Sequence, residues 1–200
     1  MIIGLTGNIG SGKSLASKIL ASFGAAVIDA DRVGHQVLQP DGAAYQTVLD
    51  AFGPRFLAED GSIRRRELGA YVFAEGNEVA LQRLNQLTHP AICEEIRRLL
   101  AAYRNEGKRF IVIEAAILFD SAILALTEEN WLIVAPRELL LARVAARDHC
   151  GRAAAERRLA SQRTLEDLEK LADRVFVNDG DPKHLEEQLK KAYQELERAE

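Results

Sequence analysis

One segment near the start of the chain constrains its fold more than any other. Residues 7–14 read Gly-Asn-Ile-Gly-Ser-Gly-Lys-Ser and match G-x-x-x-x-G-K-[ST], the pattern of a phosphate-binding loop (P-loop) between a strand and a helix. The apolar run 2–6 precedes this segment, and Leu15, Ile19 and Leu20 follow it at helical spacing. The strand–loop–helix context that the pattern requires is therefore present.

The chemistry of this loop resides in its glycines, its lysine and its serine. Glycines allow successive backbone N–H groups to face inward around phosphate oxygens, and the N-terminus of the following helix adds partial positive charge. We expect Lys13 to act catalytically at the β- and γ-phosphates and the Ser14 hydroxyl to bind Mg²⁺. A plain glycine-rich turn is the alternative. The residues predicted to bind ATP are Gly7, Asn8, Gly10, Ser11, Gly12, Lys13, Ser14 and Leu15.

Four further apolar runs predict the remaining strands of a sheet. They occupy residues 25–28, 110–113, 131–134 and 175–177. The runs are apolar throughout rather than alternating, which is typical of parallel strands covered by helices on both faces. Predicted helices separate most of them. The expected fold class is therefore α/β, with a parallel five-stranded sheet.

Two segments exceed what a simple sheet needs. About eighty residues separate the second and third expected strands, and they read as helices interrupted by prolines and glycines. We expect an inserted helical subdomain there, with its last helix beginning at Pro90. Residues 137–162 are predicted to be helical and are dense in arginine. That segment is interpreted either as a lid that clamps phosphate or as a solvated face.

Charge and composition exclude several classes. Lysine and arginine total 26 against 30 acidic residues, a net charge of −4, which does not indicate a general binder of nucleic acid or membrane surfaces. The first residues show no basic n-region, and no apolar stretch approaches ~18 residues, so we expect a cytoplasmic protein. Cys93 and Cys150 show no ligand-like spacing, so neither a disulfide framework nor a cysteine zinc site is indicated.

The loop is shared by switches, motors and kinases, so other residues must select the class. Residues 31–34 have the D-x-x-G spacing of GTPases, but the chain contains no Asn-Lys-x-Asp to read guanine. A long ATPase core is hard to accommodate in 200 residues that include so large an insertion. A small-molecule kinase fits better, and a nucleotide-dependent switch without catalysis is the alternative from another class.

From residue 3 to about residue 180 the chain resembles the dephospho-CoA kinase family of P-loop kinases. The residues that carry the resemblance are the loop 7–14, Val27-Ile28-Asp29-Ala30-Asp31, Phe52-Gly53, Asp60-Gly61, Arg65, Thr88-His89-Pro90, Leu118-Phe119, Arg147-Asp148, Gln162, Ala172-Asp173, Asn178 and Gly180. The resemblance implies ATP-dependent phosphorylation of the ribose 3′-hydroxyl of dephospho-CoA, the last step of CoA biosynthesis, with Mg²⁺ bound to the nucleotide. Another P-loop small-molecule or nucleotide kinase is the alternative.

The resemblance also gives each predicted part of the chain a role. Residues 1–30, 105–140 and 164–200 are expected to form the nucleotide-binding core, 31–104 a helical subdomain that binds the CoA acceptor, and 141–163 the lid. Dephospho-CoA is the expected partner, with no nucleic acid and no membrane. We expect a monomer, or at most a weak oligomer.

A carboxylate after the second strand suits the acceptor chemistry, because the acceptor hydroxyl must be oriented and lose its proton. We predict Asp31 as the catalytic base and as a substrate contact, with Asp29 as a second substrate-binding residue. The alternative for both is that they cap the following helix, since aspartate is common at that position.

Arginines after the fourth strand are candidates to stabilise the transferring phosphoryl group. Arg143 and Arg147 are four residues apart and share a helical face, so both are predicted to be catalytic. Three further arginines, Arg157, Arg158 and Arg163, are expected instead to pair with carboxylates on a solvated surface, namely Glu156, Glu166 or Asp167.

Three more candidates follow the family's positions. His89 and Arg65 are predicted to bind the acceptor, and Asn178 is predicted to lie on the adenine side of the nucleotide. The alternatives are a helix cap for His89 and a charged helix start for Arg65.

The chain departs from the family pattern at several positions. Leu15 stands where threonine is usual, and Asn8 where glycine is common; Asn tolerates positive φ better than most residues. The two acids after the third strand are exchanged in length, as Glu114 and Asp120. This exchange bears on how Glu114 is placed toward a magnesium ion.

Overall fold

The computed structural model describes residues 1–199 and divides into two compact units. The first contains residues 1–29 and the chain from 102 onward, and the second contains residues 30–101. These bounds lie close to the predicted limits of the helical subdomain. The predicted lid segment, 141–163, falls within the first unit.

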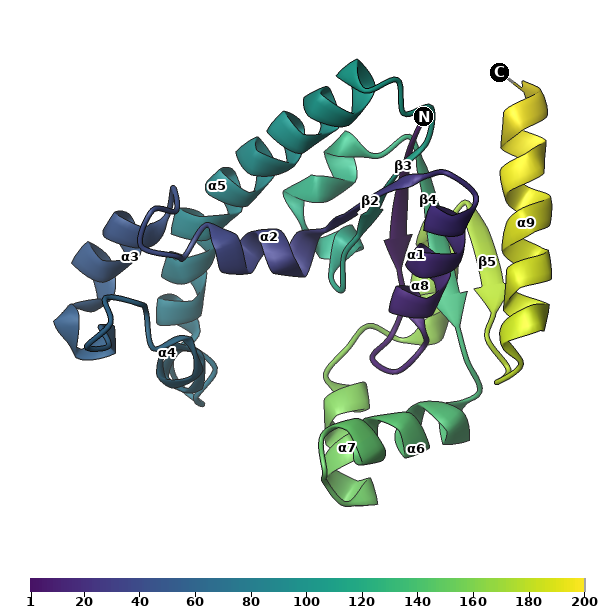
Figure 1. Ribbon diagram of the computed structural model, residues 1–200. Coiled ribbons are helices and arrows are strands. Elements are labelled where there is room, and N and C mark those ends of the chain that lie inside the picture. The colour runs from purple at the N-terminus through teal and green to yellow at the C-terminus, as the bar shows by residue number, and fades with distance from the viewer. Residues whose placement is uncertain (200) are drawn as a thin grey trace. The chain divides into compact units, whose positions relative to one another are not determined.

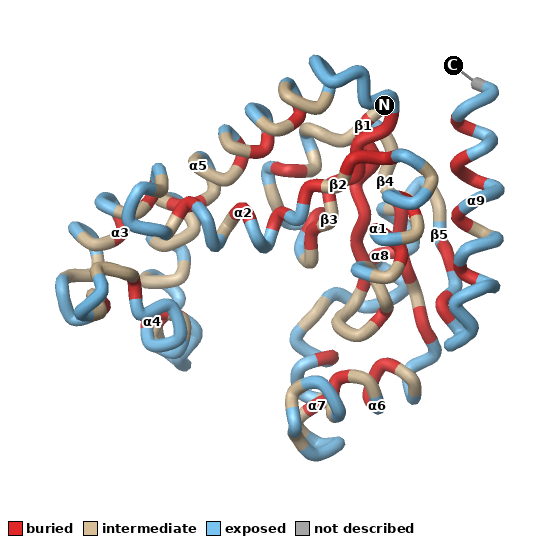
Figure 2. The backbone as a smooth tube through the Cα atoms, in the orientation of Figure 1, coloured by how far each residue is buried: buried red, intermediate tan, exposed pale blue. Residues whose placement is uncertain are grey.

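The first unit is built on a parallel sheet of five strands in the order β2-β3-β1-β4-β5. The strands are β1 (Ile2–Thr6), β2 (Ala26–Asp29), β3 (Ile111–Glu114), β4 (Glu129–Val134) and β5 (Arg174–Val177). β1 lies at the centre and is buried along its whole length, as Figure 2 shows. The predicted α/β class with a five-stranded parallel sheet is confirmed.

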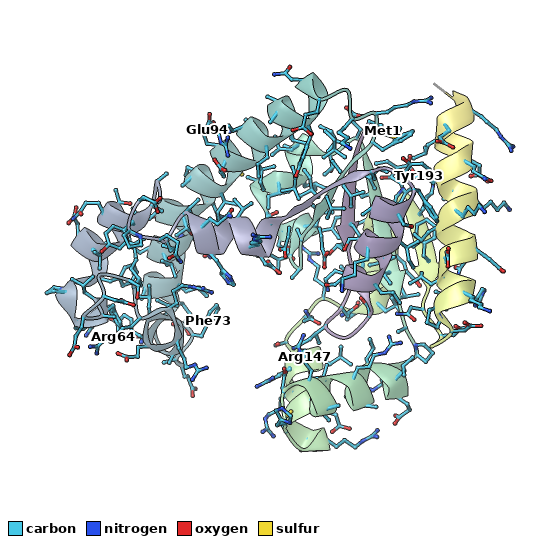
Figure 3. All side chains as sticks on the ribbon, viewed as in Figure 1. Met1, Arg64, Phe73, Glu94, Arg147 and Tyr193 are labelled. Atoms are coloured by element: carbon cyan, nitrogen blue, oxygen red, sulfur yellow. The ribbon has the colours of Figure 1, made fainter. Side chains whose placement is uncertain are left out.

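Two helices form the main core with this sheet. α1 (Lys13–Ser22) and α9 (Pro182–Ala199) pack against each other, and α9 is the yellow helix of Figure 1. Alternate strand residues, among them Ile3 and Trp131, contribute to the same buried cluster as Leu20 and Leu189. Tyr193, labelled in Figure 3, packs on Phe110 with ring centroids 4.7 Å apart. The resulting core fixes the end of β1 from which the loop departs.

The remaining helices of this unit follow β3 and β4. Two short 3₁₀ helices, Leu118–Asp120 and Ala122–Leu126, lie between these strands, and α8 (Leu165–Leu171) packs on β4. α6 (Arg137–Arg147) and α7 (Arg152–Ala160) occupy the arginine-rich segment. The segment 137–162 is helical, as predicted, but it forms two helices rather than one continuous run. His149 adopts a left-handed φ of 49° between the two helices and interrupts the run.

The second unit is helical, as predicted. It contains α2 (Ala30–Gln36), α3 (Tyr45–Phe52), a 3₁₀ turn (Pro54–Phe56), α4 (Arg65–Val72) and most of α5 (Glu78–Asn105). Phe52, Phe56 and Tyr71 form a cluster of edge-on and tilted rings. α5 begins at Glu78, so the prediction of a helix starting at Pro90 is wrong, and the helix continues through that proline.

Candidate functional site

The loop 7–14 follows a backbone path that two of its glycines make possible. Gly12 has a φ of 101°, and a Cβ atom there would lie 2.1 Å from Asn178 Nδ2. A Cβ at Gly7 would lie 2.3 Å from the carbonyl oxygen of Ile133. Neither distance is sterically tolerable, so both positions require glycine. The glycines that identified the loop in the sequence are therefore needed for its conformation.

Lys13 is the first residue of α1, and its side chain lies over the loop. Its Nζ donates hydrogen bonds to the carbonyl oxygens of Gly7, at 2.7 Å, and Asn8, at 3.3 Å. The ammonium group is therefore held at the loop, where the predicted phosphate site requires positive charge.

A carboxylate joins two of the three serines of α1. Ser14 Oγ donates to Glu114 Oε1 at 2.8 Å, and Ser17 Oγ donates to Glu114 Oε2 at 2.6 Å. Glu114 ends β3, whose register places it beside Leu5 of β1. Ser17 is three residues after Ser14 and so shares its face of the helix. Ser17 had no predicted role, although its spacing from Ser14 was the signal for one.

The same group of oxygens has the chemistry of a magnesium site. Mg²⁺ prefers oxygen ligands and commonly binds through one or two protein oxygens, several waters and substrate phosphates. The Ser14 hydroxyl and the Glu114 carboxylate supply oxygens of this kind beside the loop. Among residues 1–199 no group of three or more His, Cys, Asp or Glu side chains could hold a metal by itself. The donor set therefore fits a magnesium ion that arrives with a nucleotide.

The segment between α7 and α8 contacts the outer part of the loop. Gln162 Oε1 accepts a hydrogen bond from the backbone N–H of Ile9 at 2.8 Å, and Asn8 Nδ2 donates to the carbonyl oxygen of Arg163 at 3.3 Å. Gln162 carried part of the family resemblance, yet the sequence did not assign it a contact. Its partner lies 153 residues away in the chain.

Arg163, in the same segment between α7 and α8, forms an ion pair with Asp120. Arg163 Nε lies 2.9 and 2.8 Å from the two carboxylate oxygens of Asp120, and its Nη2 donates to the same carboxylate. These hydrogen bonds hold the pKa of Asp120 below its ordinary value and raise the pKa of Arg163. The pair borders a pocket of about 190 Å³ that also includes Gly7 and Asn8. Arg163 therefore pairs with Asp120 and not with the predicted Glu156, Glu166 or Asp167.

Arg143 and Asn178 lie against the other side of the loop. Arg143 donates from Nη1 to the carbonyl oxygen of Gly10 at 3.1 Å and from Nη2 to Asn178 Oδ1 at 3.2 Å. Asn178 Nδ2 donates to the carbonyl oxygen of Ser11 at 2.7 Å, and the residue is only 2% exposed. Both residues are predicted site residues, and the structure brings both to the loop.

Arg147 lies at the end of α6, where it is labelled in Figure 3, and makes different contacts from Arg143. It pairs with the adjacent Asp148, with Nε–Oδ1 and Nη2–Oδ2 distances of 2.7 and 3.1 Å. Arg158 also donates to Asp148. The Arg147 side chain is exposed, whereas Arg143 donates a hydrogen bond to the loop backbone.

In the second unit a wide pocket of about 800 Å³ brings together charged residues of two helices. Asp31 and His35 come from α2, and Arg65 and Arg66 come from α4. Two of these, Asp31 and Arg65, are predicted acceptor-binding residues. Arg66 and His35 had no predicted role, because the sequence does not show that residues of α2 and α4 line one pocket.

The other two predicted acceptor-binding residues lie elsewhere. Asp29 is the last residue of β2, in register with Glu114 of β3. His89 lies within α5, half-buried, and is not among the described residues that line the wide pocket. A mid-helix position rules out the helix-cap alternative for His89. Asp31 lies in the first turn of α2, where a carboxylate also favours the helix electrostatically.

Comparison with protein families gives one match over nearly the whole chain. The model of the dephospho-CoA kinase family matches residues 1–184. A curated dephospho-CoA kinase of Carboxydothermus hydrogenoformans is 43% identical over 188 residues, covering 94% of this chain and 90% of that protein. One from Geobacter sulfurreducens is 38% identical over 192 residues, covering 96% of both.

Solved structures agree with these sequence matches. The dephospho-CoA kinase of Campylobacter jejuni superposes with a TM-score of 0.73 at 30% identity, covering 99% of this chain and 98% of that one. A shikimate kinase of Acinetobacter baumannii covers 100% of this chain and 94% of its own, with a TM-score of 0.55 at 16% identity. The second likeness concerns the fold alone.

Proposed function

This chain belongs to the dephospho-CoA kinase family, and from that premise we propose how its residues divide the work of the reaction. The chain uses ATP to phosphorylate dephospho-CoA at the ribose 3′-hydroxyl, which yields coenzyme A and ADP in the last step of CoA biosynthesis. The alternative of another small-molecule kinase is not favoured, because shikimate kinases share only the fold.

The loop 7–14 binds the phosphates of ATP. The observation that carries this assignment is the loop's position between β1 and α1, with Lys13 Nζ held on the Gly7 and Asn8 carbonyls. Backbone N–H groups at a helix N-terminus attract anions, and a lysine there neutralises charge on the transferring phosphoryl group. The nucleotide-binding residues are those of the matched pattern together with the backbone of Leu15.

Ser14 is the magnesium ligand among this chain's residues. Its hydroxyl is held by Glu114, which is itself held by Ser17, so the oxygen is oriented before a nucleotide arrives. When bound, Mg²⁺ neutralises charge on the β- and γ-phosphate oxygens. Glu114 is long enough to contact both serines. The double contact gives the longer acid at this position a use, although its length differs from the family pattern.

Asp31 is the base for the acceptor hydroxyl, and Asp29 assists in binding the acceptor. As the 3′-oxygen forms its bond to phosphorus, the bond between phosphorus and the ADP oxygen breaks and the hydroxyl proton passes to the Asp31 carboxylate. The support comes from the wide pocket, in which Asp31 lies with Arg65, a residue suited to an anionic acceptor. His89 contributes a further acceptor contact from α5.

Arg143 and Arg147 stabilise the charge on the transferring group. Arg143 brings its guanidinium to the loop through Gly10, which supports an electrostatic contribution there. Arg147 is exposed and paired with Asp148, so its contribution requires exchange of that carboxylate for phosphate oxygens. Both residues lie on α6 and within the proposed lid, residues 141–163.

The protein acts as a cytoplasmic monomer. Every helix in the described part of the chain is too short or too polar to cross a membrane. Light scattering after gel filtration measures the mass of the particle, and a dimeric mass would contradict the monomer.

Incubation of the pure protein with ATP, Mg²⁺ and dephospho-CoA tests the reaction directly. We expect ADP release and a product heavier by one phosphoryl group. Shikimate and nucleosides serve as control acceptors and are expected to give no turnover. Tight ATP binding without transfer to any alcohol would indicate a switch, and turnover on a control acceptor alone would indicate another kinase.

A further inference from the structure

Asn178 makes the shortest contact between the loop and a side chain from the far end of the chain. Its Nδ2 lies 2.7 Å from the Ser11 carbonyl oxygen, 167 residues away in the sequence. The residue directly follows β5, and its backbone N–H donates to the carbonyl oxygen of Val134 at 2.8 Å. Asn178 is 2% exposed, so its amide approaches the loop from within the protein.

Arg143 determines which way this amide faces. A guanidinium only donates hydrogen bonds, so Arg143 Nη2 pairs with the oxygen of the Asn178 amide, at 3.2 Å. The amide nitrogen is then directed to Ser11, whose carbonyl oxygen only accepts. Arg143 Nη1 also holds the neighbouring Gly10 carbonyl at 3.1 Å. Each of these three hydrogen bonds pairs a donor with an acceptor.

The contact with Ser11 has a consequence for the next N–H group of the loop. In a planar trans peptide the C=O and N–H bonds point in opposite directions. A Ser11 carbonyl oxygen that faces Asn178 therefore directs the Gly12 N–H away from Asn178, on the other side of that peptide. Anion-binding loops depend on such aligned N–H groups. A reversed Ser11–Gly12 peptide would present an oxygen to phosphate instead.

We propose that Asn178 is a positioning residue for ATP: its buried amide, oriented by Arg143, holds the Ser11–Gly12 peptide in the orientation that binds phosphate, without touching the nucleotide. The inference deepens the proposed function and rests on the assignment of loop 7–14 as the phosphate site. It gives Asn178 a role different from the predicted adenine contact. It also accounts for Gly12, where even a methyl group would collide with the Asn178 amide.

The test is an Asn178→Ala variant, with ATP affinity measured by calorimetry and backbone hydrogen exchange measured without nucleotide. A buried carbonyl without its donor is costly, so we expect ATP to bind about tenfold more weakly. Amides of residues 9–14 should exchange faster, while those of β1 and α9 should be unchanged. The KM for dephospho-CoA should stay within twofold of the wild-type value.

Gln188→Ala is the matched control. Gln188 also hydrogen-bonds backbone through its amide, accepting from Val177 N at 3.0 Å and donating to Val177 O at 2.8 Å, one residue before Asn178. We expect this variant to keep wild-type ATP affinity and loop exchange. Equal effects in the two variants would mean that β5 is merely destabilised, and the proposal would be wrong.

A second variant covers the case in which Asn178→Ala does not fold. Arg143→Lys keeps the positive charge but loses the fork that spans Gly10 and Asn178, so it should raise loop exchange and weaken ATP binding by a smaller factor. Wild-type exchange in every folded variant would overturn the proposal. A wild-type protein that fails to bind ATP would instead overturn the proposed function, because loop exchange is measured without nucleotide.

Discussion

The phosphate loop and the wide pocket of the second unit are built in opposite ways. The loop consists of eight consecutive residues whose backbone forms the expected anion site, and its conformation requires glycine at Gly7 and Gly12. The pocket takes its charged groups from two helices, with Asp31 and Arg65 thirty-four positions apart in the sequence. A site made of backbone is local in sequence, whereas a site made of side chains depends on which helices pack together.

The two regions also differ in how they are held. The loop is contacted from both sides, by Gln162 on one and by Arg143 and Asn178 on the other. The pocket is wide, and charged side chains form part of its wall. This contrast predicts that changes at the loop affect ATP and the chemical step, and that changes in the pocket affect the acceptor.

The largest effect is expected from Lys13→Ala. Removal of the ammonium should lower kcat by at least about 10³-fold, because the alanine methyl group cannot neutralise charge on the transferring phosphoryl group. Steady-state kinetics measure this loss. Lys13 also holds the Gly7 and Asn8 carbonyls, so thermal unfolding must show that the variant is folded. A folded variant with kcat within tenfold of wild type would contradict the assignment.

Asp31→Asn should follow, with kcat lower by about 10²- to 10⁴-fold and ATP affinity nearly unchanged. The amide keeps the size of the side chain but cannot accept the proton. Asp50→Asn is the matched control, since Asp50 lies on α3 of the same unit and pairs with Gln46. An unchanged kcat for Asp31→Asn would contradict the role of Asp31 as the base. Its carboxylate would then favour the first turn of α2 without acting in catalysis.

Arg65→Ala sharpens the contrast between ATP and acceptor. We expect the KM for dephospho-CoA to rise about 10- to 100-fold, with the ATP dissociation constant unchanged, because a charged hydrogen bond to an anionic acceptor is lost. Arg64→Ala is the control, since Arg64 forms an exposed ion pair with Glu67. Equal weakening of ATP and acceptor binding by Arg65→Ala would remove the distinction between the two regions.

The smallest effect is expected from Asp120→Asn at the edge of the loop. The pair with Arg163 is largely exposed, so the melting temperature at pH 7 should fall by no more than about 3 °C. Arg163 holds the pKa of Asp120 below its ordinary value, so the stabilisation is complete above the unfolded-state pKa. It is lost as the pH falls through the lower folded-state value.

The difference in melting temperature between wild type and Asp120→Asn should therefore shrink as the pH falls below about 4. Differential scanning calorimetry across this range measures it. Glu166→Gln, which removes an exposed pair with Lys170 on α8, is the control. A difference that grows toward low pH would mean that the pKa of Asp120 is raised in the folded protein.

Prediction from the sequence succeeded where the signal was local, and it was wrong or incomplete where packing or a single dihedral angle decided the structure. The apolar runs located the strands because parallel strands are buried on both faces, and the loop was identified by its own residues. The start of α5 was missed because a proline within a helix resembles a proline that begins one. The break between α6 and α7 depends on the left-handed conformation of His149, which no residue pattern in the sequence predicted.

The sequence by itself determined the phosphate loop, the α/β class and the family, because each depends on residue types at fixed spacing. Only the tertiary structure decided which side chains hold that loop. Asn178 and Gln162 reach it from 167 and 153 residues away, because the sheet order places β4 beside β1 and β5 beside β4. The glycines that the path of the loop requires are local in the sequence, whereas the side chains that hold the loop are set by the packing of distant elements.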